Sequence, residues 1–183
     1  MIYCQTRKTA FGPITICVES GCITVLIIGS SDASRLKKTI DAGNATMVPE
    51  NDQLNSQAES ALPKRDSALL AKAFSQLEEY FAGKRRKFSL PLNPKGTPFM
   101  QQVWQALCEI PYGTVISYQE LAERIGNRRA TRAVGQANHR NPIPVFIPCH
   151  RVISKDGGLG GYECGLDTKE RLLALEGVLF ASK

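Results

Sequence analysis

Several features that would assign this chain to a class at once are absent from its sequence. Its 6 cysteines include no Cys-x-x-Cys pair, and its first residues lack the basic region and apolar core of a secretory signal, so we expect a reducing interior. The longest apolar run, residues 25–28, is far shorter than the roughly 20 residues that a membrane helix needs. We therefore expect a soluble, cytoplasmic protein without a membrane partner, or a nuclear one if the source is eukaryotic.

Composition excludes further classes without choosing one. Hydrophobic residues at 43% and charged residues at 22% are ordinary globular values, which exclude disordered, collagenous and disulfide-miniprotein chains. Lys and Arg outnumber Asp and Glu by 23 to 17, which is compatible with a polyanionic partner. The basic excess is local, because residues 124–151 contain no acid. The arginines of this stretch are Arg124, Arg128, Arg129, Arg132, Arg140 and Arg151.

The N-terminal half predicts a small sheet followed by one helix. Residues 2–28 cluster β-branched residues around two turn signals, which indicates two or three antiparallel strands. Residues 30–66 are polar and predict mostly mobile loop. A helix capped by Asp66 or Ser67 is expected next, and Gly83 is expected to end it.

A proline-containing connector, residues 90–96, divides the chain into two halves. We expect the boundary near Asn93, which gives an N-terminal domain of residues 1–92 and a C-terminal domain of residues 93–183. The basic run just before the connector, residues 84–87, is interpreted as a solvated surface near a helix end rather than as a phosphate contact.

Short helices dominate the prediction for the C-terminal domain. Thr97 as N-cap, with Pro98 after it, opens one helix, and a capping box at residues 117–120 opens the next. A third segment, residues 130–137, follows a tight turn, so the pair forms a helix-turn-helix whose second helix commonly enters a DNA groove. Another capping box, residues 167–170, predicts a last helix.

The third segment presents a face of small residues, Ala130, Ala133 and Ala137. A helix with such a face can enter a narrow groove, which favours the minor groove and largely sequence-independent binding. A generic helix pair with solvated arginines is the alternative at this point.

The most reactive residue types stand together at the end of residues 142–152. This apolar, proline-punctuated run predicts extended chain. It ends in a soft nucleophile, Cys149, a base that titrates near neutral pH, His150, and a permanent cation, Arg151. The structural alternative is a small buried cysteine beside a surface His-Arg pair.

Cys149 and His150 predict a relay if a carboxylate joins them, because a thiol needs a base and the base needs an acceptor that orients it. Adjacent side chains of an extended chain point to opposite faces, so we expect a water molecule to bridge His150 to Cys149. Cys108, in contrast, is expected to be a core residue.

Five strings of the C-terminal domain form one specific pattern. They are Arg-Ala-Val-Gly-Gln-Ala at 132–137, Asn-Pro at 141–142, Ile-Pro-Cys-His-Arg-Val at 147–152, Gly-Gly-Tyr at 160–162, and Lys-Glu-Arg-Leu-Leu-Ala-Leu-Glu-Gly at 169–177. This pattern resembles the O6-alkylguanine-DNA alkyltransferase (methylated-DNA--protein-cysteine methyltransferase) family over residues 97–177. Residues 1–92 match only in outline, through Phe-Gly-Pro-Ile at 11–14 and the strand pattern.

The resemblance implies an α+β fold and a DNA-repair activity. The fold would comprise a small antiparallel-sheet domain with a helix, ribonuclease H-like, and a mainly helical domain with a winged helix-turn-helix-like DNA-binding motif. The activity would be a single-turnover transfer of an alkyl group, without cofactor, from O6-alkylguanine in duplex DNA, and from O4-alkylthymine as well, to the protein's own cysteine.

By the same resemblance, Cys149 is the nucleophile and His150 activates it through water. Glu176 would orient His150, and Asn141 would brace the turn that brings the helix pair to the site. Because a thioether has no good route back to a thiol, the product would be a spent protein.

The resemblance also implies that the target base is flipped out of the duplex. Arg132 matches the arginine finger that fills the vacated stack. Tyr118 matches the residue that crowds the 3′ phosphate and contacts the flipped base. The further positions expected to bind DNA are Arg129, Ala130 and Ala133.

The base pocket is implied in the same way. Tyr162 would form one wall, and the backbone N–H of Glu163 would donate to the base oxygen. The carbonyls of Cys149 and Val152 would accept from the exocyclic amine of the base, and Lys169 would lie near the cysteine.

Some positions depart from the family pattern. Asn138 stands where an apolar residue can line the pocket, and Cys164 occupies a variable position that shapes the pocket mouth. The structural zinc of some members is not expected, because both histidines lie at the reaction end and Cys4 and Cys22 alone cannot complete four ligands.

The expected partner is double-stranded DNA that carries O6-alkylguanine, bound by a monomer without an obligate protein partner. One alternative is a non-catalytic DNA-binding protein that recognises lesions or regulates genes. Another is a cysteine hydrolase that uses Cys149, His150 and Glu176 and turns over without DNA.

Overall fold

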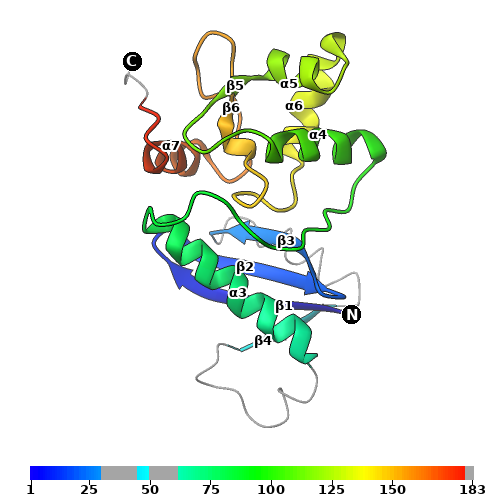
Figure 1. Cartoon of the computed structure of the whole chain (residues 1–183), viewed down its shortest axis with the longest axis vertical. Helices are drawn as coiled ribbons and strands as arrows, with labels where there is room; N and C mark the ends of the chain where they lie inside the picture. Colours follow the sequence, from blue (N-terminus) through cyan, green and yellow to red (C-terminus); the bar gives the residue numbers. More distant parts are fainter. Residues whose placement is uncertain (30–44, 50–61, 180–183) are drawn as a thin grey trace. The chain divides into compact units, whose positions relative to one another are not determined.

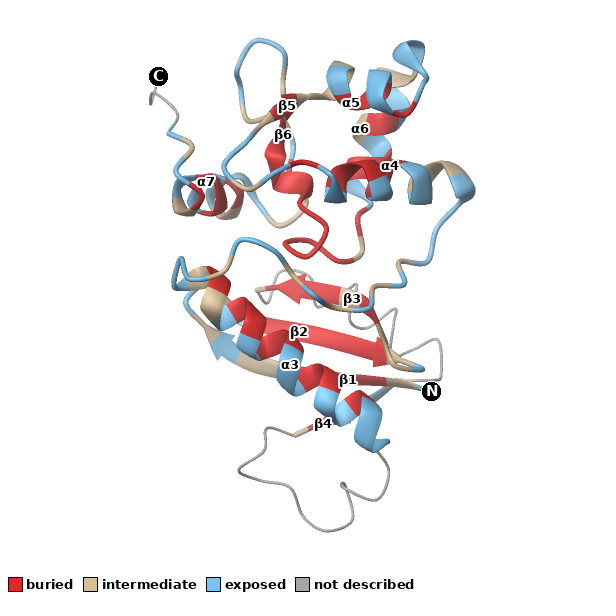
Figure 2. Cartoon of the chain, in the orientation of Figure 1, coloured by how far each residue is buried: buried red, intermediate tan, exposed pale blue. Residues whose placement is uncertain are grey.

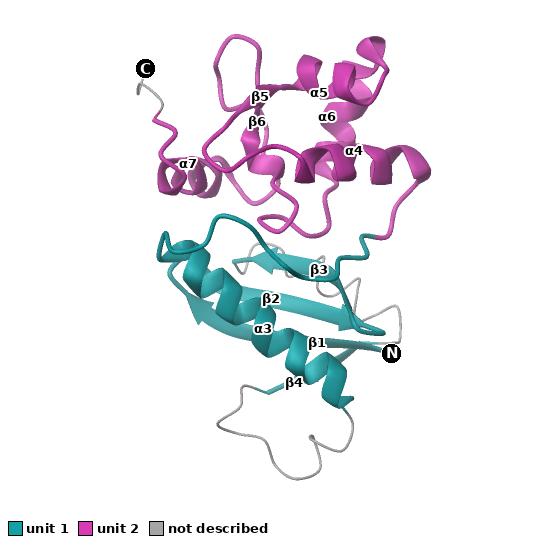
Figure 3. Ribbon diagram, in the orientation of Figure 1, with its two compact units in different colours: residues 1–94 teal, residues 95–183 magenta. Residues whose placement is uncertain are grey.

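The computed structural model describes residues 1–29, 45–49 and 62–179 (Figure 1). The chain forms two compact units, residues 1–94 and residues 95–183 (Figure 3). This division falls after residue 94, where the sequence led us to expect one after residue 92. Within the described ranges, no helix is both long and apolar enough to cross a membrane.

In residues 1–29, 45–49 and 62–94, the first unit has a sheet of four strands with one helix packed on it. Three antiparallel strands confirm the prediction for residues 2–28, and a fourth strand, β4, lies within the polar stretch where mostly loop was expected. Its parallel partner is β1, distant in sequence, so the local residue types gave no sign of it. The rest of the expected loop, residues 30–44 and 50–61, lies outside the described residues. The strands are β1 (Ile2–Thr9), β2 (Gly12–Glu19), β3 (Cys22–Ile28) and β4 (Ala45–Val48), in the order β3-β2-β1-β4.

The helix of this unit, α3 (Lys64–Phe81), turns its buried residues toward the sheet (Figure 2). The expected caps are wrong, because the helix begins after Pro63 and has no side-chain cap. The carboxylate of Asp66 instead accepts a hydrogen bond from the backbone N–H of Gly21, at 2.7 Å, in the turn between β2 and β3. The expected end is confirmed, since Gly83 follows the helix with φ +71°, a conformation that glycine adopts without strain.

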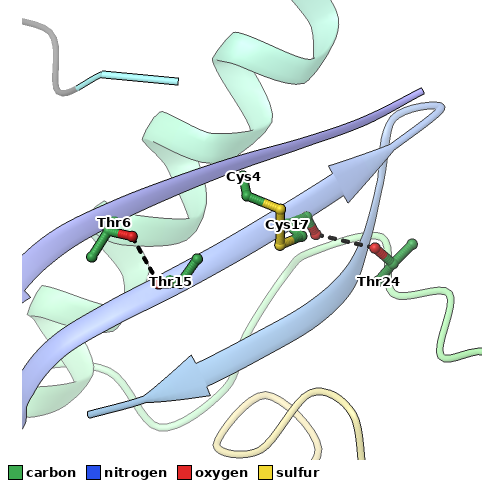
Figure 4. The surroundings of a disulfide bond; sticks show 5 residues. All are labelled: Cys4, Thr6, Thr15, Cys17 and Thr24. Atoms are coloured by element: carbon green, nitrogen blue, oxygen red, sulfur yellow. Dashed lines mark hydrogen bonds between the residues drawn. A yellow bond between two sulfur atoms is a disulfide. The ribbon is translucent and has the colours of Figure 1, made fainter. Parts of the chain in front are cut away.

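A disulfide joins Cys4 of β1 to Cys17 of β2 (Figure 4). Our expectation of reduced cysteines is therefore wrong for these two. The two residues are direct partners in the antiparallel register, with Cα atoms 4.0 Å apart, and both are buried. Only the register brings them together, because 13 positions separate them in sequence. Beside them, the hydroxyls of Thr6 and Thr15 form the same kind of cross-strand pair, 2.8 Å apart.

The second unit is mainly helical, with one short pair of parallel strands. The helices α4 and α5 both contact α6, and β5 pairs with β6 through Ile116 and Val152. The elements are α4 (Pro98–Cys108), β5 (Ile116–Ser117), α5 (Tyr118–Arg124), η3 (Arg128–Ala130), α6 (Thr131–His139), η4 (Cys149–Arg151), β6 (Val152–Ile153) and α7 (Leu166–Leu175).

Local signals set the starts of two of these helices. The Thr97 hydroxyl accepts from the backbone N–H of Met100, and Ser117 and Glu120 form both bonds of the predicted capping box. The capping box expected at residues 167–170 is wrong, because α7 begins at Leu166 without a side-chain cap. The core assignment of Cys108 is also wrong, because this residue is exposed at the end of α4.

Candidate active site

The loop before Cys149 is folded back on itself and is not the extended chain that we expected. An isolated bridge joins Pro144 to Ile147, and Val145 between them is fully buried with φ +73°. A β-branched residue adopts this conformation only where the surrounding packing imposes it. Cys149 then opens the 3-10 turn η4, so the opposite-face argument for a water between its side chain and that of His150 does not apply.

Asn141 connects this loop to the thiol. Its amide Nδ2 donates to Sγ of Cys149 at 3.0 Å and to the carbonyl of Ile147 at 2.9 Å. Its Oδ1 accepts from the backbone N–H of Ile143 at 3.0 Å. One buried amide thus fixes both the turn and the position of the sulfur atom, a direct contact that the sequence did not indicate.

Glu176 is the centre of a buried charged cluster beside the cysteine. Its carboxylate meets Nε2 of His150 at 2.9 Å and receives two bonds from Arg151, at 2.9 Å from Nε and 2.8 Å from Nη2. It also accepts from the backbone N–H of Gly113 at 3.0 Å. The remaining arm of Arg151, Nη1, donates to the carbonyl of Ile110 at 2.6 Å. Both carboxylate oxygens of Glu176 therefore accept hydrogen bonds, as a buried carboxylate requires.

Sequence reasoning placed His150 with Glu176 but missed the other members of this cluster. Arg151 had been placed in the reactive string with Cys149 and His150, with a surface position as the alternative, but its pairing with Glu176 was not predicted; it is 6% exposed. Its position directly after His150 in one tight turn was the available signal. The roles of Ile110 and Gly113 had no sequence signal, because they contribute backbone atoms.

Burial controls the protonation of the reacting pair. It raises the pKa of the Cys149 thiol, against the opposing effects of the Asn141 hydrogen bond and the charge of Lys169. It lowers the pKa of the His150 imidazole, although the bond to Glu176 acts in the opposite direction. At neutral pH the resting pair is therefore a thiol and a neutral imidazole.

The ammonium group of Lys169 connects two chain segments near Cys149. Its Nζ donates to the carbonyl of Val152 at 2.6 Å and to that of Leu159. Burial lowers its pKa to about 8, and the negative charge that Cys149 carries when ionised opposes this shift. Lys169 is thus a cation near the sulfur at neutral pH, and it is not a wall of the pocket.

A small pocket opens onto the sulfur of Cys149. Four of the expected pocket residues line it, whereas Tyr118, Val152 and Lys169 do not. The phenol of Tyr118 lies nearby, and its hydroxyl donates to the carbonyl of Gly161 at 3.4 Å. The sequence missed His139, Pro144 and Gly161. The lining residues are Asn138, His139, Asn141, Pro144, Cys149, Gly161, Tyr162, Glu163 and Cys164.

The helix-turn-helix presents its basic residues to solvent. Arg129 and Arg132 are exposed, as is Ala133, while Ala130 is half-buried. The second helix begins at Thr131, one residue later than expected, because residues 128–130 form a 3-10 turn.

One residue of the expected small-residue face belongs to the core. Ala137 is buried, and its carbonyl accepts from the indole N–H of Trp104 at 2.8 Å. The exposed part of the face therefore comprises Ala133 and the half-buried Ala130.

Metal ligands do not gather anywhere in residues 1–29, 45–49 and 62–179, where no group of three or more His, Cys, Asp or Glu side chains could hold an ion. Cys4, which had been weighed as a ligand, is bound to Cys17.

Comparison with known proteins identifies the family. The family model for the 6-O-methylguanine DNA methyltransferase ribonuclease-like domain matches residues 2–94, and that for the DNA binding domain matches residues 98–178. The chain belongs to the 6-O-methylguanine DNA methyltransferase family. Both domains of the family are thus present in order, and the fold expected from the sequence is confirmed.

Several relatives agree with this family assignment. The constitutive methylated-DNA--protein-cysteine methyltransferase of Bacillus subtilis is 41% identical over 100% of both chains. The corresponding protein of Mycobacterium leprae is 39% identical over 96% of this chain and 93% of its own. A crystal structure of Mycobacterium tuberculosis OGT in complex with DNA is 35% identical, with a TM-score of 0.77 over 95% of this chain and 92% of that one.

Proposed function

We propose that this chain repairs DNA by direct reversal, transferring the alkyl group of O6-alkylguanine to Sγ of Cys149. One observation carries the assignment to this cysteine. Cys149 lines the pocket, its sulfur accepts a hydrogen bond from Asn141, and the next residue in the chain, His150, belongs to the buried cluster with Arg151 and Glu176. The names of the Bacillus and Mycobacterium relatives support a methylated-DNA substrate and a cysteine acceptor.

The buried cluster supplies the base for this reaction. The carboxylate of Glu176 holds the Nε2 proton of His150, which leaves Nδ1 as the ring atom that accepts the thiol proton, directly or through water. Arg151 keeps Glu176 ionised and in place, and the charged Lys169 stabilises the thiolate as it forms. The pair is neutral until substrate arrives, so the thiolate is generated only beside the alkyl carbon.

The transfer is a substitution at the alkyl carbon. The S–C bond forms as the bond from that carbon to O6 breaks, and the guanine accepts the proton that the thiol lost. The thioether of Cys149 cannot return to a thiol without a further reactant, so each molecule acts once. No electrons are exchanged with a redox partner, and the step requires no cofactor.

Duplex DNA hides the reacting oxygen within the base stack, so the base has to be flipped into the pocket. Arg132 on the exposed side of α6 is the residue that we assign to the vacated position in the stack. We assign Arg129, Ala130 and Ala133, on the same helix-turn-helix motif, to the surface that contacts the groove. Tyr118 bonds to the carbonyl of Gly161, which lines the pocket.

We further propose that the protein binds lesion-bearing duplex DNA as a monomer, in the cytoplasm or, in a eukaryote, in the nucleus. We also propose that it accepts O4-alkylthymine as a second substrate. The C-terminal domain, residues 93–183, would carry both DNA binding and alkyl transfer, and residues 1–92 would support it.

Intact-mass spectrometry tests the assignment. The wild-type chain mixed with duplex O6-methylguanine DNA should gain the mass of one methyl group, and peptide mapping should place it on Cys149. Cys149→Ala should show no gain while its DNA affinity stays within a few fold, because phosphate and groove contacts supply most of the binding energy. Cys164→Ala, at the pocket mouth, is the matched control and should still be methylated.

The same experiment separates the two other functions. A methyl group on the Cys149→Ala chain would place the acceptor at another cysteine. DNA binding without any mass gain in the wild type would indicate a lesion-recognition protein. Many turnovers of an ester or peptide substrate without DNA would indicate a hydrolase.

A further inference from the structure

The side-chain amide of Asn138 is buried at the wall of the pocket, and its NH2 group forms a hydrogen bond. Asn138 lies in the last turn of α6 and is 3% exposed. Its Nδ2 donates to the carbonyl of Cys149 at 3.3 Å. Its Oδ1 is buried and accepts no hydrogen bond from the part of the chain that the structure describes. Such an acceptor is rare in a folded protein and calls for a donor from outside.

The orientation of this amide follows from its neighbour. The carbonyl of Cys149 can only accept, so the side of Asn138 that faces it has to be the NH2 group. The oxygen therefore lies on the other side of the amide. Asn138 and Cys149 line the same pocket, so the amide of Asn138 belongs to the wall that an entering base would contact.

The backbone acceptors expected for the exocyclic amine are already engaged. The carbonyl of Cys149 accepts from Nδ2 of Asn138 and from the backbone N–H of Val152, which uses both of its lone pairs. The carbonyl of Val152 accepts from the ammonium group of Lys169 at 2.6 Å. An amine would have to displace one of the two donors at the carbonyl of Cys149, and Val152 does not line the pocket, whereas Oδ1 of Asn138 can accept without any displacement.

We propose that Oδ1 of Asn138 accepts a hydrogen bond from the 2-amino group of the flipped guanine, and that Asn138 is thereby a specificity-determining residue. This inference rests on the proposed function. In O6-alkylguanine the ring nitrogen next to O6 carries no hydrogen, so the 2-amino group is the donor that the base offers. O4-alkylthymine offers no N–H donor on its pairing edge. Asn138 thus favours the guanine lesion and leaves its own oxygen unsatisfied when the thymine lesion is bound.

Tyr118 is the protein donor that could compete for this oxygen. Burial and the charge on Cys149 raise the pKa of the Tyr118 phenol, and its interaction with the side chain of Asn138 opposes them. If the phenol of Tyr118 bonded to Oδ1, Asn138 would position Tyr118 and would not contact the base. The two roles can be distinguished, because the transfer rate depends on the 2-amino group only if Asn138 contacts the base.

The test uses two duplexes that differ in one group, O6-methylguanine and O6-methylhypoxanthine, which lacks the 2-amino group. We expect the wild type to react at least about fivefold faster with the first, the value of one hydrogen bond. Asn138→Leu, which keeps the branch at Cγ but removes the acceptor, should reduce this ratio to below about two. Cys164→Ala changes the pocket without touching an amine acceptor, so it should alter both rates by the same factor and keep the ratio.

Each outcome has a defined meaning. Equal rates of the wild type on both duplexes, or an unchanged ratio in Asn138→Leu, would overturn the role of Asn138. If the wild type transferred no methyl group from either of the two duplexes, the proposed function itself would be wrong. If Asn138→Leu does not fold, as judged by its thermal melt, Asn138→Ser replaces it with the same expected loss of preference, and an unchanged ratio there counts equally against the proposal.

Discussion

The two units bury polar side chains for different purposes. Both have apolar cores (Figure 2). Among the described residues of the first unit, the buried polar ones are Gln5, Thr15, Thr24, Asp66 and Gln76, which include one charged group. In the second unit they are Asn138, Asn141, His150, Arg151, Lys169 and Glu176, most of which are ionisable and lie around one sulfur atom.

Hydrogen bonds to the backbone or to a neighbouring side chain accompany the polar burial in the first unit. Asp66 accepts from the N–H of Gly21, in the turn between β2 and β3, and Gln76 accepts from the N–H of Ser89 at 2.9 Å. Thr15 pairs with the hydroxyl of Thr6. In the second unit the carboxylate of Glu176 faces both His150 and Arg151, and desolvating such ions costs several kcal/mol each. Burial at that cost is typical of sites that need a shifted pKa, so the difference supports the proposal that the second unit performs the chemistry.

The largest effect should come from removing the charge at the centre of the cluster. Glu176→Gln leaves Arg151 buried without its counter-ion, so we expect a loss of about 3 to 5 kcal/mol in the free energy of unfolding. Transfer from O6-methylguanine DNA should slow by about 100-fold or more, because a neutral amide no longer stabilises the imidazolium that forms when His150 takes the thiol proton. Urea unfolding and single-turnover rates measure the two effects.

Asp66→Asn is the matched control in the first unit. The amide oxygen can still accept from Gly21, so we expect a loss of about 1 kcal/mol or less and an unchanged transfer rate. Equal losses of stability in the two variants would remove the distinction between structural and catalytic burial.

Breaking the disulfide should affect stability alone. Cys4→Ser with Cys17→Ser frees a loop closed over 13 positions, so we expect a loss of about 3 kcal/mol and a melting temperature several degrees lower. The wild type in a strong dithiol reductant should melt like the double variant, and Cys22→Ser should melt like the oxidised wild type. Transfer rates below the melting range should match in all samples. A slower transfer in the reduced protein would mean that the first unit contributes to the reaction.

Arg132→Ala should separate flipping from chemistry. We expect transfer from duplex DNA to slow by about 10- to 100-fold, because the vacated stack is no longer filled. Transfer from the free base O6-benzylguanine, which needs no flipping, should stay within about twofold. Lys87→Ala removes an exposed charge from the first unit and should change neither rate strongly. Equal slowing of Arg132→Ala on both substrates would assign Arg132 to folding or to the chemical step.

The smallest effect should appear in the pH dependence of stability. The pKa of His150 is lowered in the folded chain, so the unfolded chain takes up a proton first as the pH falls below about 6.5. Stability from this residue is therefore complete above that pH and is lost below it, by about 1 kcal/mol over the next pH unit. In His150→Gln the free energy of unfolding should not show this decrease below about pH 6.5. In His139→Gln, where the substituted position is exposed, the decrease should remain. Identical profiles for the wild type and His150→Gln would contradict the burial of a neutral imidazole.

Some local features of the structure were predicted from residues that are close together in the sequence. The cap at Thr97, the box from Ser117 to Glu120 and the stop at Gly83 were predicted correctly, because each bond joins groups within four positions of one another. The same locality explains the recognition of the family, since the reactive string and the last helix are contiguous motifs.

Tertiary structure decided whatever depended on a distant partner. Asp66 was predicted to cap a helix, but it bonds to Gly21, 45 positions away. Cys4 and Cys17 are brought together by the register of their two strands. The positive φ of Val145 is imposed by packing around it. In the site, the sequence by itself determined which groups are reactive, whereas the fold decided that Arg151 is buried against Glu176. A short-range bond is specified by residue spacing, but a long-range bond exists only after chain closure has brought the two groups together, and its geometry is then set by everything packed around them.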